Sequence, residues 1–180
     1  MPKNILKYAL GAVVVVALVS VIIAPVSHPL EGQPAPGIVL PLMGGGTLNL
    51  ADHKGKDIVI LDFWATWCSP CTKSMPVLEK VADDYASRGV VLYTINISDD
   101  PTQIEAFLKS AGLTVRVARD HAFSTARDYL VDAIPQTVII GKDGVIARVH
   151  VGASHNMSAE LRADLDALLS GERPASPPTA

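Results

Sequence analysis

The sequence has few cysteines: its 180 residues contain only two, Cys68 and Cys71. A tetrahedral zinc site needs four ligands, so two histidines would have to complete one here. Covalent haem attachment needs a histidine directly after the second cysteine, and Thr72 stands there. A structural disulfide across two residues would constrain almost no chain. These absences favour a redox-active pair, with zinc binding or two buried, inert thiols as the remaining alternatives.

The sequence also lacks any cluster of lysine and arginine, and basic and aromatic residues do not alternate along it. The formal net charge is -3. Nucleic-acid-binding proteins show the opposite pattern, so we expect no nucleic-acid partner. The length suits one domain with accessory segments, and we expect a monomer.

Charge is absent from a long N-terminal stretch, residues 8–24, which two lysines precede. It fits either a cleaved signal peptide or an uncleaved anchor. A signal peptide has an apolar core of about 7–15 residues and a small-residue cleavage site, which Pro25 spoils. We therefore favour a membrane anchor over residues 1–27, close to the ~20 residues that span a bilayer. No lysine or arginine follows before Lys54, so the positive-inside rule places the domain outside the cytoplasm.

The composition divides the rest of the chain. Proline-rich residues 28–37 predict a stiff, extended linker. Residues 171–180, rich in proline and serine, predict a disordered tail. The folded domain is expected between them, over residues 38–170.

Within this domain, apolar runs suited to strands alternate with segments of helical spacing. The expected strands are 38–40, 47–50, 58–63, 90–97, 115–117, 137–140 and 145–151, and the expected helices follow Cys71, Asp100, His121 and Met157. Ser158 is the expected cap of the last helix. This order predicts an α/β fold, a central mixed sheet flanked by helices, with an N-terminal β-hairpin.

The two cysteines lie where a strand meets a helix. The apolar run 58–61 leads into residues 63–71, Phe-Trp-Ala-Thr-Trp-Cys-Ser-Pro-Cys. A Cys-x-x-Cys motif beside a βαβ pattern is typical of a redox pair. The helix N-terminus favours a thiolate on Cys68, because its free N–H groups and dipole stabilise negative charge.

This sequence resembles the thioredoxin superfamily, and more closely its membrane-anchored TlpA/ResA-like thiol–disulfide oxidoreductases. The resemblance covers roughly residues 32–170 and rests on four segments: 63–71, the opening Gly-Gln-Pro-Ala-Pro at 32–36, Ala-Ile-Pro-Gln-Thr at 133–137, and Lys-Asp-Gly at 142–144 with Gly152. It implies a thioredoxin-like fold and protein substrates with disulfides.

The resemblance also implies roles for individual residues. Cys68 would be the exposed nucleophile that forms a mixed disulfide, and Cys71 would resolve it. Pro135 would face the pair in cis, and the backbone of Ile134 would bind an extended substrate segment; an ordinary trans turn proline is the alternative. We assign Trp67 and Pro70 to the substrate-binding rim.

Asp62 stands six positions before Cys68, where thioredoxins bury an acid that relays the proton of the second cysteine. Burial would raise the pKa of such a carboxyl group, as a proton acceptor for Cys71 requires. The alternative is a strand-end aspartate with local hydrogen bonds. One position departs from the TlpA/ResA-like group, because Ser74 replaces its usual glutamate.

The expected function is a protein-disulfide reductase on the periplasmic side of the bacterial inner membrane, with no cofactor and no metal. Family resemblance suggests cytochrome c maturation or metal-site cysteines as clients and a transmembrane thiol relay as electron donor. Three alternatives remain: a thiol oxidase or isomerase, a copper-delivery module, and a peroxiredoxin-like peroxidase. The last would need threonine at position 65, which is alanine.

Overall fold

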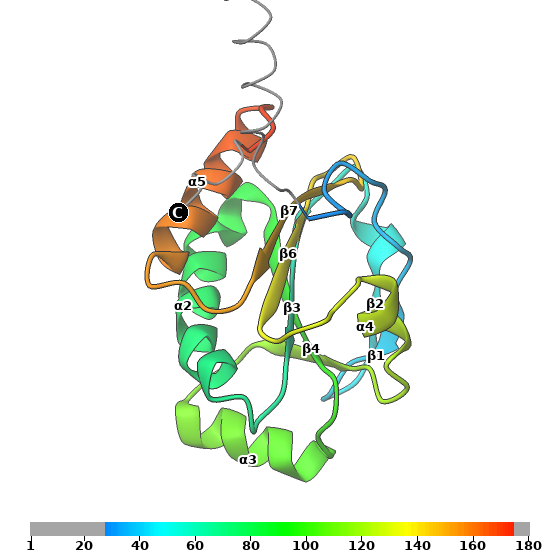
Figure 1. The fold of residues 1–180 in the computed structure, drawn as a ribbon, viewed down its shortest axis with the longest axis vertical. Coiled ribbons are helices and arrows are strands. Elements are labelled where there is room, and N and C mark those ends of the chain that lie inside the picture. The colour runs from blue at the N-terminus through cyan, green and yellow to red at the C-terminus, as the bar shows by residue number, and fades with distance from the viewer. Residues whose placement is uncertain (1–27, 175–180) are drawn as a thin grey trace, which may run out of the picture. The chain divides into compact units, whose positions relative to one another are not determined.

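The computed structural model describes residues 28–174, built around a five-stranded sheet (Figure 1). The strand order is β5-β4-β3-β6-β7. Strands β3, β4 and β5 run parallel, whereas β6 and β7 run antiparallel to their neighbours. Their bounds are β3 Ile58–Trp64, β4 Val90–Asn96, β5 Arg116–Arg119, β6 Gln136–Ile140 and β7 Ile146–Val151. The predicted central mixed sheet is confirmed.

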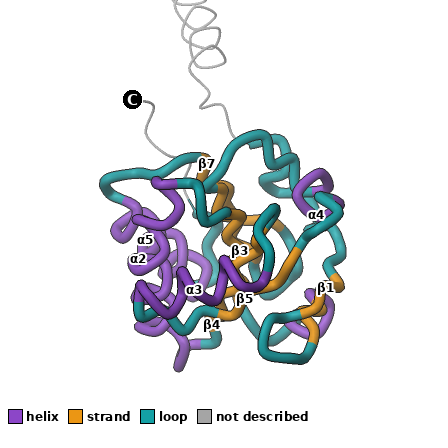
Figure 2. Tube along the Cα trace, turned by 90° about the horizontal axis from the view of Figure 1, so that it is seen from below, coloured by secondary structure: helices purple, strands orange, loops and turns teal. Residues whose placement is uncertain are grey.

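Helices and a hairpin cover the two faces of the sheet. Helices α2 (Ser69–Tyr85) and α5 (Met157–Leu169) pack on one face, where Leu78 and Leu161 are buried. The hairpin of β1 (Val39–Pro41) and β2 (Thr47–Asn49) lies on the other side with the short α4 (Ser124–Asp128), as Figure 2 shows from below. Because both faces are covered, all seven residues of β3 are buried, which explains its nearly continuous apolar run.

Local signals fix most element ends. Helix α3 (Pro101–Ala111) is capped at its start by Asp100, which forms a capping box with Gln103. It ends at Gly112, whose φ of 66° is the left-handed conformation that glycine adopts without strain. The predicted cap at Ser158 is wrong: the cap position is Asn156, two residues earlier. Ser158 lies within α5, where its hydroxyl accepts a hydrogen bond from Arg162.

The segment predicted as a linker, residues 28–37, lies against the sheet. Backbone hydrogen bonds join Gly32 and Gln33 to Ile146, at 2.8 and 2.9 Å. The Glu31 carboxylate accepts from the Val149 backbone at 3.0 Å and lies 3.4 Å from the buried Arg148. Proline is common in extended linkers, which is why the sequence predicts one here. The edge of a sheet also tolerates proline, because only one side of an edge strand is hydrogen-bonded.

The predicted terminal segments are described only in part. The anchor over residues 1–27 lies outside the described residues, as do residues 175–180 of the predicted tail. Among residues 28–174, no helix combines the length and apolarity needed to cross a membrane. Residues 171–174 continue from α5, and Pro174 is buried.

Candidate active site

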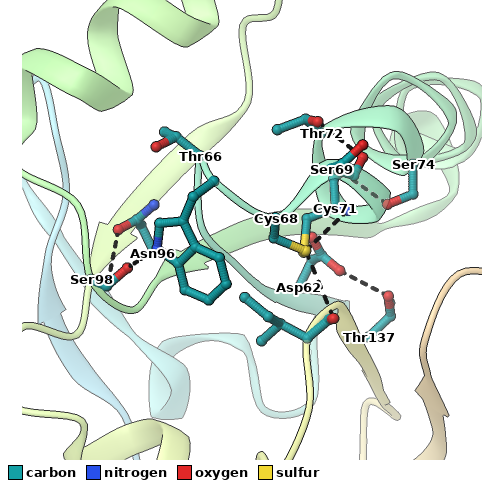
Figure 3. The surroundings of a disulfide bond; sticks show 12 residues. Asp62, Thr66, Cys68, Ser69, Cys71, Thr72, Ser74, Asn96, Ser98 and Thr137 are labelled. Atoms are coloured by element: carbon teal, nitrogen blue, oxygen red, sulfur yellow. Dashed lines mark hydrogen bonds between the residues drawn. A yellow bond between two sulfur atoms is a disulfide. The ribbon is translucent and has the colours of Figure 1, made fainter.

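The two cysteines lie at the carboxyl end of the central strand β3. Cys68 occupies the N-cap of α2, and its Sγ accepts a hydrogen bond from the Cys71 backbone at 3.2 Å. Pro70 fits the first turn of the helix, where a backbone N–H would have no partner in the helix. A disulfide bond joins Cys68 to Cys71, so the structure shows the oxidised pair (Figure 3).

The pair is more buried than the sequence suggests. Cys68 keeps 5% of its surface exposed and Cys71 keeps none. The backbone carbonyl of Ile134 covers Cys68, with its oxygen 3.7 Å from Sγ. Because a disulfide sulfur carries no proton, this is a contact rather than a hydrogen bond. Any nucleophile from outside therefore reaches Cys68 first.

The loop before β6 supplies that carbonyl group. The Ile134–Pro135 peptide bond is cis, as the sequence predicts. Pro135 is buried, whereas Ile134 is half-buried and Ala133 is exposed. This leaves a short stretch of backbone accessible beside Cys68, as an extended substrate segment would require.

Asp62 is completely buried on β3. Its Oδ1 accepts a hydrogen bond from the Thr137 hydroxyl at 2.9 Å, while Oδ2 has no partner among the described residues. Burial raises the pKa of Asp62 to about 7, and the bond from Thr137, which lowers it, offsets this only in part. Figure 3 shows the carboxyl group pointing toward the disulfide. Asp62 can therefore gain or lose a proton near neutral pH beside the pair.

A second buried carboxyl group holds the turn that leads into Cys68. Asp99, after β4, accepts hydrogen bonds from the Thr66 backbone at 2.7 Å, the Thr66 hydroxyl at 2.8 Å and the Asn96 amide at 2.7 Å. In the sequence, Asp99 directly precedes Asp100 and the predicted start of a helix, which gives it no role at the site. An acid directly after the parallel strand next to β3 was the available signal, because ligands gather at the carboxyl ends of parallel strands.

The two tryptophans of the motif point in opposite directions. Trp67 is 67% exposed at the rim, and its Nε1 donates to the Ser98 hydroxyl at 2.9 Å. Trp64 is fully buried and packs against Phe107 at 5.3 Å between ring centroids. Trp67 is thus a surface residue of the turn that carries the cysteines, while Trp64 belongs to the core.

Ser74 occupies the position where the TlpA/ResA-like group usually has glutamate. It is buried, and its hydroxyl donates to the Cys71 carbonyl at 3.0 Å. It therefore brings no charge to the pair, and Asp62 is the buried carboxyl group that Figure 3 shows there. Within residues 28–174, no cluster of three or more histidine, cysteine, aspartate or glutamate side chains could hold a metal ion.

Comparison with known proteins agrees with this geometry. Residues 30–169 match the Redoxin family. The chain belongs to this family. Among Redoxin relatives, thioredoxin-like protein YneN of Bacillus subtilis is 38% identical over 138 residues, which cover 76% of this chain and 80% of YneN. Thiol-disulfide oxidoreductase ResA of the same species is 34% identical over 122 residues, or 68% of each chain.

Solved structures of similar Redoxin-like proteins give the same fold. A crystal structure described as thiol:disulfide interchange protein DsbE of Chlorobium tepidum has a TM-score of 0.72 and 30% identity, covering 77% of this chain and 97% of that one. StoA of Bacillus subtilis has a TM-score of 0.58 and 25% identity, covering 67% and 90%. The predicted thioredoxin-like fold is confirmed, and this Redoxin protein is a thiol–disulfide oxidoreductase of the ResA/DsbE type.

Proposed function

We propose that this protein is an extracytoplasmic reductase of protein disulfides, with Cys68 as the nucleophile and Cys71 as the resolving thiol. One observation carries the assignment of roles: Cys68 is the member of the pair with exposed surface, and it faces the Ile134 carbonyl. The client segment around a cysteine bound to Cys68 would lie along that backbone. Cys71, which is fully buried, would lie on the inner side of the mixed disulfide.

The reaction begins with the reduced pair. The Cys68 thiolate attacks one sulfur of the client disulfide, which forms a mixed disulfide and releases the first client thiolate. Cys71 then loses its proton and attacks Cys68 Sγ, which releases the second client thiolate. Two electrons pass to the client, and the enzyme is left with the disulfide seen in the structure.

Asp62 is the proton acceptor for Cys71 in this scheme. With a pKa of about 7, its carboxyl group is partly ionised at neutral pH and can take a proton from the thiol. Because Asp62 has no exposed surface, its charge is not screened by water, and it acts on the thiol beside it.

The direction and location of the reaction are further parts of the proposal. The Ser-Pro dipeptide between the cysteines is nearer to the Gly-Pro of reducing thioredoxins than to the Pro-His of strong oxidants. The apolar residues 8–24 support a membrane anchor, with the catalytic domain on the periplasmic side. Clients would be the haem-site cysteines of apocytochromes c or metal-site cysteines, and a transmembrane thiol relay would reduce the pair again.

Trapping tests the roles of the two cysteines. Cys71→Ser leaves Cys68 unable to release a client, so covalent partners should accumulate and separate only on reducing gels. Cys68→Ser should trap none. Equal trapping by both variants would contradict the assignment, and the partners of Cys71→Ser would identify the client.

Two measurements test the direction and the location. Equilibration with a dithiol of known potential should give a value near the −270 mV of reducing thioredoxin, against about −120 mV for a strong oxidant. A value near the oxidant would favour a thiol oxidase instead. Protease added to spheroplasts should digest the catalytic domain, whereas protection would contradict an extracytoplasmic location.

A further inference from the structure

A groove of about 460 Å³ opens directly beside the cysteine pair. One wall is the first part of α2, with Pro70, Lys73 and Val77, and the other is the loop that joins β7 to α5, with His155. Pro70 lies between the two cysteines in the sequence, so the groove begins at the turn that carries the pair. Its volume is within the ~300–1,000 Å³ typical of ligand sites.

The groove combines an apolar base with positive charge. Val77 is 37% exposed and Met157 contributes to the base. Lys73 is exposed and supplies the charge, and His155 lies on the opposite wall. No carboxylate lines the groove among the described residues. The carboxylate of nearby Glu160 accepts a hydrogen bond from Ser154 at 2.8 Å.

We propose that this groove binds the client polypeptide next to the disulfide under attack and selects clients with acidic side chains there. The inference rests on the proposed reductase function and adds the chemistry of its substrate. Positive charge on one partner and negative charge on the other favours encounter and disfavours wrong partners. A basic client segment would meet Lys73 as a like charge.

The geometry sets where the acidic residues should lie. Lys73 follows Cys68 by five residues, which is about 7–8 Å along a helix at ~1.5 Å per residue. An extended client spans about 3.3 Å per residue. The favoured acidic side chains therefore lie two or three residues from the client cysteine.

Peptide disulfides of matched length test this selectivity. Each peptide carries one cysteine, with glutamate, glutamine or lysine at the second and third positions on both sides, and is oxidised to its symmetric dimer. The reduced full-length protein in mild detergent should reduce the glutamate peptide about two to five times faster than the glutamine peptide, the range expected for an exposed ion pair, and the lysine peptide more slowly still. Because exposed charges are screened, 0.5 M salt should narrow the difference.

Charge reversal assigns the effect to the groove. Lys73→Glu should reverse the order of the glutamate and lysine peptides. Lys109→Glu, which makes the same charge change on an exposed residue of α3, should preserve the wild-type order. Neutral 2-hydroxyethyl disulfide reports the general reactivity of the thiols, and all rates are divided by its rate.

Each result has one meaning. Equal rates for the glutamate and glutamine peptides would overturn the proposed selectivity, and so would a Lys73→Glu effect that is the same for every disulfide. If the peptide rates are equal and Lys73→Glu changes the oligomeric state by light scattering, the groove binds a second copy of the chain instead. Failure to reduce any disulfide, 2-hydroxyethyl disulfide included, would contradict the proposed function itself.

Discussion

Asp62 and Asp99 are two buried acids near the same catalytic turn, but their surroundings differ. Asp99, 5% exposed, accepts three hydrogen bonds through its two carboxylate oxygens. Asp62 has no exposed surface and accepts one, from Thr137, while its second oxygen has no partner among the described residues. The pKa of Asp62 is raised to about 7 by burial.

The difference separates a residue that holds the site from one suited to reaction. Three donors fix the Asp99 carboxylate and, through Thr66, the turn that presents Cys68. A carboxyl group with an unpaired oxygen is costly to bury in its ionised form, so its pKa rises and it can gain or lose a proton near neutral pH. Such incomplete hydrogen bonding in a native core calls for an explanation, and the disulfide beside Asp62 provides one.

The largest expected effect comes from Asp62→Asn. The ordinary pKa of this carboxyl group is 3.8, and in the folded protein it is about 7. Between these values the native state binds more protons than the unfolded state, so stability falls as pH rises through this range and levels off above it. The loss is roughly 4 kcal/mol between pH 4 and 8. Asparagine cannot ionise, so the variant should lack this component of the pH dependence.

Urea unfolding of the oxidised protein across this pH range measures the difference between wild type and variant. Asp132→Asn is the matched control, because Asp132 is exposed and should leave the pH dependence unchanged. If wild type and Asp62→Asn lose stability in parallel as pH rises, Asp62 is not the buried titrating group. Asp62→Asn should also slow the release of mixed disulfides at neutral pH.

Asp99→Ala should have the next largest effect on stability. The change leaves the backbone and hydroxyl of Thr66 and the amide of Asn96 without their acceptor. We expect a loss of about 3 kcal/mol, because an unsatisfied buried donor costs about 1–3 kcal/mol and water can replace part of the acceptor. The measurement is the urea midpoint at constant m-value.

Asp100→Ala is the control for Asp99, since it removes the neighbouring exposed helix cap and should cost about 1 kcal/mol. An Asp99→Ala variant no less stable than Asp100→Ala would show that the three hydrogen bonds do not hold the turn. That result would remove the contrast between the two carboxyl groups.

The sequence predicts most of the fold, because short local patterns mark most of its strands and helices. Within a few residues each, the apolar run predicts strand β3, and Asp100 and Gly112 mark the two ends of α3. The segment 28–37 shows where local patterns fail. Its pairing with β7 joins residues more than a hundred positions apart, and composition carries no trace of that contact.

The site divides in the same way. The cysteine pair could be named from its motif, and Pro135 and Asp62 from the resemblance to thioredoxins, but the partner of Asp62 could not. Thr137 reaches it from β6 because the sheet order places β6 beside β3. The role of Asp99 could not be predicted, because Asp100, the next residue, already accounts for an acid at the start of α3. Hydrogen bonds between distant segments thus distinguish the two buried acids: three donors fix the Asp99 carboxylate, whereas Asp62 has one donor and an unpaired oxygen.

Thr137→Val should have the smallest effect and tests the contrast most directly. Valine keeps the shape of threonine but removes the hydroxyl group that donates to Asp62. Because that bond lowers the pKa of Asp62, its loss should raise the pKa further above 7, by an amount equivalent to about 1 kcal/mol. The midpoint of the Asp62-dependent loss of stability, taken as Thr137→Val minus the double variant Thr137→Val/Asp62→Asn, should lie at higher pH than in wild type minus Asp62→Asn.

Thr94→Val is the matched control for this change. Thr94 pairs with Asp62 from the opposite neighbour, β4, but its hydroxyl donates to the Arg116 carbonyl at 3.5 Å. The control should leave the midpoint in place, whereas Thr137→Val should also slow resolution by Cys71 at neutral pH, because less Asp62 is ionised to accept the proton. A midpoint that stays fixed in Thr137→Val would mean that burial alone sets the proton affinity of Asp62. The reactivity of this acid would then depend on its depth in the sheet rather than on the number of donors around it.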